Sequence, residues 1–139
     1  MTERPLILLL DGNALVHRAY HAIRPLTSPS GEPTNATFGF TSTLLKVLHD
    51  FDAEYVAVAF DVGRTFRHDM YPEYKANRPA LPDDLRVQLD RVRELVAAFG
   101  LPAEYAVGYE ADDVLATLSK KAVEQGLDVV IVTGDSDIL

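Results

Sequence analysis

The chain has 139 residues, of which 47% are hydrophobic and 24% are charged, and it contains no cysteine. This size and composition predict a single folded domain and exclude a disulfide scaffold, a thiolate metal site and a cysteine nucleophile. The formal net charge of −8 argues against broad electrostatic affinity for nucleic acid, and the excess is uneven: 5 basic residues stand against 12 acidic ones after residue 80. The longest aliphatic run, residues 6–10, is too short to cross a bilayer and has no signal-peptide cleavage site, so we expect a cytoplasmic protein.

Short apolar runs alternate with amphipathic segments from the start of the chain. We expect a strand over residues 5–11, whose continuous apolar run is typical of a strand buried on both faces of a parallel sheet. A helix over 14–22 follows, and then a loop over 24–35 that holds three prolines. The next helix, over 36–51, places Phe40, Leu44, Val47 and Leu48 on one face, and residues 55–60 form a second buried strand.

The same alternation returns after residues 62–81, which show little periodicity. A helix over 82–99 ends at Gly100, and its apolar stripe consists of Leu85, Leu89, Val92, Val96 and Phe99. A weak strand over 103–107, a helix over 110–125 and a strand over 128–132 complete the pattern. Strands that alternate with helices predict a three-layer α/β fold with a mainly parallel central sheet flanked by helices. Residues 135–139 resemble the first turn of a further helix, so we expect a chain truncated at its C-terminus.

Acidic side chains gather at the carboxyl ends of the predicted strands. Seven carboxylates end a strand, follow one closely or open the helix after the third strand: Asp11, Asp61, Glu110, Asp112, Asp113, Asp135 and Asp137. Ligands of open parallel sheets bind at this edge, and seven like charges would repel one another there. A hard divalent cation, Mg²⁺ or Mn²⁺, would relieve that repulsion. Each acid alone also fits a turn or helix-cap role, but their joint position favours a metal site.

The segment 64–78 is the one basic stretch of this acidic chain. It interleaves four cations with three aromatic residues: Arg64, Phe66, Arg67, Tyr71, Tyr74, Lys75 and Arg78. Cations suit phosphate recognition and aromatic rings stack on bases, although the alternative is a solvated loop with its rings in the core. Arg18, Tyr20 and His21 follow Asp11 on the next helix and can face the same crevice.

Four motifs carry a resemblance to a known family. The segments LLLDGNALVHRAYHA, FDVGRTFRHDMYPEYKANRPALPDDL, GYEADDVLATL and TGDSDIL resemble the 5′-nuclease (5′-3′ exonuclease) domains of bacterial DNA polymerases I, part of the flap-endonuclease group with a PIN-like core. The resemblance implies that the seven acids bind two Mg²⁺ or Mn²⁺ ions and that residues 1–139 are the N-terminal portion of such a domain. It also implies that Arg67, Lys75 and Arg78 contact the scissile or neighbouring phosphates, with Tyr20 near the displaced 5′ end.

The implied activity is metal-dependent hydrolysis of DNA phosphodiesters near 5′ ends or flaps, in replication and repair, with RNA primer strands as further substrates. The DNA-binding residues would be Arg18, Tyr20, Arg64, Arg67, Tyr74, Lys75 and Arg78, and a polymerase domain would be fused downstream. Two alternatives stay open: an inactive or weakly DNA-binding fragment of such a nuclease, and a small PIN-type ribonuclease. A phosphatase with Asp11 as nucleophile is disfavoured, because Asn13 stands where a second aspartate is needed.

Overall fold

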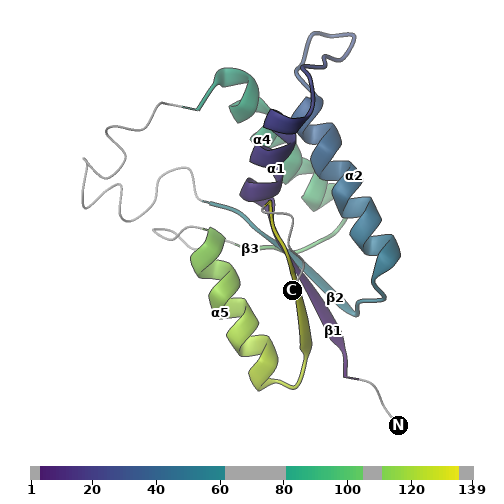
Figure 1. Ribbon diagram of the computed structural model, residues 1–139, viewed down its shortest axis with the longest axis vertical. Helices are drawn as coiled ribbons and strands as arrows, with labels where there is room; N and C mark the ends of the chain where they lie inside the picture. The colour runs from purple at the N-terminus through teal and green to yellow at the C-terminus, as the bar shows by residue number, and fades with distance from the viewer. Residues whose placement is uncertain (1–3, 62–80, 105–110, 135–139) are drawn as a thin grey trace, which may run out of the picture.

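The computed structural model describes residues 4–61, 81–104 and 111–134, and Figure 1 shows their arrangement. The elements in chain order are β1 (Leu6–Asp11), α1 (Gly12–Ala22), α2 (Asn35–Asp50), β2 (Tyr55–Ala59), α4 (Asp83–Ala98), β3 (Ala103–Glu104), α5 (Ala111–Glu124) and β4 (Asp128–Val132). None of the helices in these ranges is long and apolar enough to span a membrane.

The strands form one parallel sheet in the order β3-β2-β1-β4. The central strand β1 pairs on both sides, so that Leu8 stands opposite Val56 in β2 and Val130 in β4. Helices α1, α2 and α4 pack together on one side of the sheet, and α5 packs on the other side against β1, β2 and β4 (Figure 1). The predicted three-layer α/β fold with a parallel sheet is therefore confirmed.

Successive side chains of a strand alternate between the two faces of the sheet, so the hydrophobic core has two parts. Leu8 and Leu10 enter the cluster formed with α1, α2 and α4, whereas Leu9 enters the smaller cluster under α5. All three leucines are fully buried, because successive side chains of a strand point to opposite faces and both faces of β1 are covered. Alanines 57 and 59 of β2 face α5, and their small side chains let that helix approach the sheet.

The predicted elements agree with the structure, apart from shifts of one or two residues at their ends, with one correction in α4. Leu85, Leu89, Val92 and Val96 are buried as expected, but Phe99 is 46% exposed and lies at the C-cap of the helix. The chain turns at Gly100, whose φ of 75° places it in the left-handed region, and the Leu101 N–H donates to the Val96 carbonyl at 3.2 Å. This turn ends the stripe at Val96 and packs Leu101 against the core in place of Phe99. Of the weak strand over 103–107, residues 103–104 form β3 and the rest lie outside the described residues.

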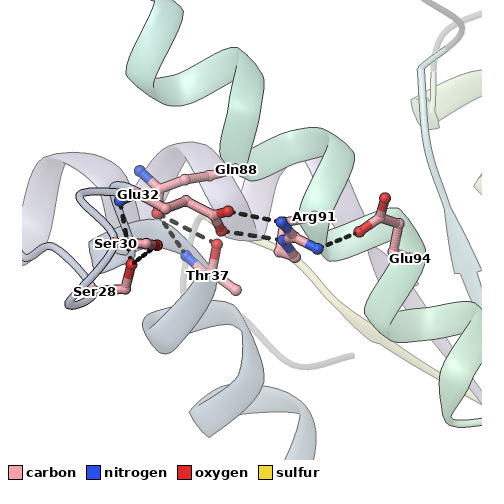
Figure 2. A network of polar contacts seen from close by, with 7 residues as sticks. All are labelled: Ser28, Ser30, Glu32, Thr37, Gln88, Arg91 and Glu94. Atoms are coloured by element: carbon pink, nitrogen blue, oxygen red, sulfur yellow. Dashed lines mark hydrogen bonds and ion pairs between the residues drawn. The ribbon is translucent and has the colours of Figure 1, made fainter.

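Two buried side-chain amides join α1, α2 and α4, the three helices on one side of the sheet. Gln88 of α4 is fully buried, and its Oε1 accepts from the Thr37 N–H in the first turn of α2 at 2.9 Å. Figure 2 draws this contact as a dashed line. Its Nε2 donates to Asn35 Oδ1 at 2.9 Å, and Asn35 Nδ2 donates to the Ile23 carbonyl after α1 at 2.9 Å. Helix ends leave backbone groups without intrahelical partners. The Gln88–Asn35 pair satisfies such groups at the start of α2 and the end of α1.

A cluster of charged side chains, formed by Glu32, Arg91 and Glu94, lies near Gln88 (Figure 2). Arg91 of α4 donates from Nη2 to Glu32 Oε1 at 2.7 Å and from Nη1 to Glu94 Oε2 at 2.7 Å. The hydrogen bond from Arg91 lowers the pKa of Glu32. Because these groups are in contact with solvent, they add little stability and serve to fix the loop before α2 against α4.

The buried amide pair predicts the cost of removing it. Replacing Gln88 with Leu leaves the Thr37 N–H and the Asn35 amide without their buried partner, so we expect the free energy of unfolding to fall by about 2–3 kcal/mol. The same change at exposed Gln125 is the control, with an expected effect within about 0.5 kcal/mol. Urea unfolding of both variants measures this, and equal effects at the two positions would contradict it.

Candidate functional site

Two of the predicted acids lie at the carboxyl ends of adjacent strands. Asp11 is the last residue of β1 and stands opposite Ala59 of β2, and Asp61 follows β2 by two residues. The side chain of Asp11 is buried, with the residue 5% exposed, and its Oδ1 accepts from the Ala14 N–H at 3.0 Å as the N-cap of α1. Both acids therefore emerge at the same edge of the sheet, as the sequence predicts.

Asp61 is held from three helices. Its N–H donates to Asn13 Oδ1 of α1 at 2.9 Å, and its carbonyl oxygen accepts from Arg93 Nη2 of α4 at 2.6 Å. Its side-chain Oδ1 accepts from the N–H of Ala111, the first residue of α5. The residue follows the last ladder pair of β2, so these contacts replace the hydrogen bonds of the sheet.

Each of these carboxylates faces the start of a helix, where unpaired N–H groups concentrate partial positive charge that favours an anion. Asp11 accepts from the first turn of α1 and Asp61 from the first residue of α5. Both acids therefore have the helix-capping role that an aspartate can have without any metal. A carboxylate has two oxygens with about four lone-pair sites, so capping a helix leaves it able to bind a cation as well.

Of the five other predicted ligands, some lie within the described residues and some lie outside them. Asp113 lies in α5, half-buried, and its carbonyl accepts from Thr117 Oγ1 at 3.1 Å. Asp112 also lies in α5, and Glu110, Asp135 and Asp137 lie outside the described residues. Among the residues that the structure describes, no group of three or more His, Asp or Glu side chains is arranged to hold a metal ion.

The predicted DNA-binding residues of α1 face different neighbours. The Tyr20 hydroxyl donates to Asp84 Oδ1 of α4 at 2.9 Å, and this hydrogen bond raises the pKa of Tyr20. Arg18 is exposed and lines a cavity of about 400 Å³ between α1, α2 and the end of β4, together with Lys46. The structure thus does not bring Arg18 and Tyr20 to one shared contact. The remaining predicted DNA contacts, Arg64, Arg67, Tyr74, Lys75 and Arg78, lie outside the described residues.

Two residues at this edge have roles that the sequence pattern did not reveal. Asn13 accepts the Asp61 N–H, and Arg93 donates to the Asp61 carbonyl while its guanidinium lies 5.5 Å from the centre of the Phe60 ring. The position of Asn13, two residues after a strand-end aspartate, was the available signal for its role. The sequence held no signal for the role of Arg93, because charged residues are common in α4.

His17 of α1 lies near this edge and has a shifted pKa. Burial lowers its pKa, His21 lowers it further, and the negative charge of Asp61 opposes both. His17 is therefore less readily protonated in the folded chain than in the unfolded chain.

Two solved structures of bacteriophage T5 proteins share this fold. A zinc-bound form of the T5 5′-exonuclease matches with a TM-score of 0.67 and 21% identity, covering 96% of this chain and 57% of that one. The T5 D15 protein crystallised with metal ions matches with a TM-score of 0.64 and 24% identity, covering 95% of this chain and 51% of the other. At these identities the likeness concerns the fold.

The family follows from the sequence comparison. The model of the 5′-3′ exonuclease N-terminal resolvase-like domain matches residues 6–139, and the chain belongs to that family. The chain is 52% identical over 137 residues to DNA polymerase I of Chloroflexus aurantiacus, covering 97% of this chain, and 46% identical over 133 residues to the thermostable DNA polymerase I of Thermus aquaticus, covering 95%. It spans 14% and 16% of the length of these relatives. The resemblance seen in the four motifs is confirmed.

The lowered pKa of His17 predicts an acid-sensitive contribution to stability. As pH falls below the ordinary value of 6.5, the unfolded chain takes up a proton at this histidine before the folded chain does, so folding becomes less favourable. We expect His17→Gln to reduce the loss of stability between pH 7.5 and pH 5.5, whereas His49→Gln, at an exposed position of α2, leaves it unchanged. Urea unfolding at the two pH values measures this, and parallel pH profiles for the parent and His17→Gln would contradict it.

Proposed function

We propose that this chain forms part of the metal-binding centre of a 5′-nuclease that hydrolyses DNA phosphodiesters near 5′ ends. The observation that carries the proposal is the pair of strand-end carboxylates, Asp11 and Asp61, held at one sheet edge in a chain of the 5′-3′ exonuclease family. A lone capping aspartate is common, but two on adjacent strands at the ligand-binding edge of a parallel sheet favour a cation site.

The donor set fits a hard divalent ion. Carboxylate oxygens are the ligands that Mg²⁺ and Mn²⁺ prefer, and the chain has no cysteine that would favour a softer metal. We include the five further acids of the predicted set as ligands of two ions: Glu110, Asp112, Asp113, Asp135 and Asp137. The T5 proteins that share the fold were solved with metal ions, which are zinc in one structure and accompany DNA in another, and this supports extending a metal ion and DNA to this chain.

The net charge of the chain is consistent with this assignment. The seven proposed ligands account for most of the formal charge of −8, so the remainder of the chain is almost neutral. Bound divalent ions would offset the repulsion among these acids and leave the segment 64–78 as the most basic stretch of the sequence. The net charge of −8 therefore agrees with a metal-dependent phosphodiesterase, because it includes the ligand carboxylates but not the positive charge of the bound ions.

Each residue has a separate task in the proposed reaction. Asp11 and Asp61, together with the five further acids, would hold the ions, and such ions would supply an activated water and stabilise the leaving oxygen of a phosphodiester. Arg67, Lys75 and Arg78 offset the charge that grows on the phosphate, and Arg18, Tyr20, Arg64 and Tyr74 contact the DNA strand.

The wider setting is proposed by analogy with the relatives. Since the chain spans 14% and 16% of two DNA polymerases I, we place it in a polymerase-linked nuclease of replication and repair, in the cytoplasm. DNA flaps are the proposed substrates, and RNA primer strands are a further one.

A conservative change at Asp61 tests the metal centre. Asp61→Asn keeps an oxygen that accepts the Ala111 N–H but removes the negative charge, so the fold should be retained while Mn²⁺ affinity falls at least about tenfold. Calorimetric titration with Mn²⁺ and Mg²⁺-dependent cleavage of a 5′-flap duplex are the two measurements, and cleavage should be lost. Asp52→Asn, at an exposed acid between α2 and β2, is the matched control.

The two measurements separate the possible outcomes. Mn²⁺ binding that depends on Asp61 without flap cleavage would support the metal centre and favour the weakly DNA-binding fragment over the complete nuclease. Cleavage of structured RNA but not of DNA flaps would favour the PIN-type ribonuclease. Equal Mn²⁺ affinity in the parent, Asp61→Asn and Asp52→Asn would overturn the metal centre itself.

A further inference from the structure

We propose that Arg93 of α4 is a positioning residue for Asp61: it fixes the main chain from which this carboxylate projects and thereby raises the affinity of the site for a divalent ion. The proposal rests on the proposed function for its metal part. Its structural part concerns a contact within the chain, and this part is tested without metal.

The contacts of Arg93 are directed at the end of β2. Nη2 donates to the Asp61 carbonyl oxygen at 2.6 Å, and the guanidinium lies 5.5 Å from the centre of the buried Phe60 ring. Nη1 lies 3.6 Å from Asp90, one turn earlier in α4. The side chain is 35% exposed, so its charged end is partly removed from water. A short hydrogen bond from a guanidinium is stronger than one between neutral groups.

Asp61 needs such partners because the sheet no longer supplies them. The last ladder contact of this strand is the Phe60 N–H, which donates to the Glu104 carbonyl at 3.0 Å. One residue further, the Asp61 N–H and carbonyl are bound by the side chains of Asn13 and Arg93. These two contacts fix both peptide planes around Asp61 and with them the direction of its side chain toward Ala111.

The position of Arg93 depends in turn on how α4 is docked. The buried Gln88 ties α4 to the first turn of α2, and Val92 and Val96 are fully buried on the same helix. A helix fixed in this way presents the guanidinium at a defined height beside β2. The guanidinium that makes the contact is therefore carried by a helix with buried contacts of its own.

The sign of the effect on metal affinity separates positioning from charge. A guanidinium near a cation site repels the cation, so removing its charge alone would strengthen metal binding. Loss of a group that orients a ligand weakens metal binding, by tenfold or more in known sites. A weaker affinity after neutralisation of Arg93 can therefore not be an effect of its charge.

The test compares two arginines of one helix in the 139-residue chain. Arg93→Gln removes the contact with Asp61, and Arg86→Gln is the control, because Arg86 has the same kind of ion pair with an aspartate three residues earlier but is exposed. Amide hydrogen exchange of the metal-free protein should become about tenfold faster at Asp61 and Ala111 in Arg93→Gln only. Mn²⁺ affinity should fall about tenfold in Arg93→Gln and not in Arg86→Gln. Arg93→Lys, which keeps a positively charged donor on a longer side chain than glutamine, should recover part of both.

The outcomes are distinct from those that test the proposed function. Unchanged exchange at Asp61 and Ala111 would overturn the positioning role whether or not the chain binds Mn²⁺. Tighter Mn²⁺ binding by Arg93→Gln would overturn it as well, because Arg93 would then act through its charge. Faster exchange at these amides in a chain that binds no Mn²⁺ at all would support the contact and overturn the metal centre. The stability of each variant is also measured by urea titration. Faster exchange at every amide in Arg93→Gln would mean that the contact contributes only to the overall stability of the fold, and this would overturn the proposal.

Discussion

The arrangement of the acidic edge depends on how closely the turn after β1 approaches the end of β2. A Cβ on Gly12 would lie 2.5 Å from the Phe60 ring and 3.0 Å from the Ala59 carbonyl oxygen, which is closer than a side chain tolerates. On the other side of β1, a Cβ on Gly134 would collide with the Ala14 carbonyl. Glycine at both positions lets the first turn of α1 lie against two neighbouring strand ends. With α1 in this position, Asn13 Oδ1 accepts from the Asp61 N–H at 2.9 Å.

Apolar burial and polar contacts contribute differently to the structure around the ends of β1 and β2. The fully buried leucines of β1 supply the hydrophobic free energy that holds the three layers together, and such burial does not specify a single orientation. The specific geometry comes from a few long-range hydrogen bonds. Gln88 and Asn35 fix α4 relative to α1 and α2, and Arg93 extends this fixed layer to the end of β2. The candidate site is thus held from the helical layer as well as from the sheet.

The sequence predicts the elements well because each carries a local signal, a continuous apolar run for the strands and a 3.6-residue stripe for the helices. It also predicts the edge at which Asp11 and Asp61 emerge, since parallel strands share their carboxyl ends. Phe99 is misassigned because the stripe cannot reveal that Gly100 turns the chain before the ring reaches the core. The roles of Asn13, Gln88 and Arg93 are not predictable from spacing, because their partners lie 48, 53 and 32 positions away. Asn13 and Gln88 each carried a weaker signal, the first as a polar residue two positions after a strand-end aspartate and the second as a polar residue on the apolar face of α4, whereas Arg93 carried none.

The most direct measurement of the central claim is the paramagnetic broadening of backbone amide signals by Mn²⁺ in NMR spectra of the chain. A strand rises by about 3.3 Å per residue, so the two ends of β1 and β2 are well separated for this effect. If the carboxylate edge binds the ion, broadening at low Mn²⁺ concentration should be strongest at Asp11, Gly12 and Asp61 and weak at Leu6 and Tyr55, at the opposite ends of the same strands. Broadening that is uniform, or strongest at Leu6 and Tyr55, would contradict a metal centre at the carboxyl edge of the sheet.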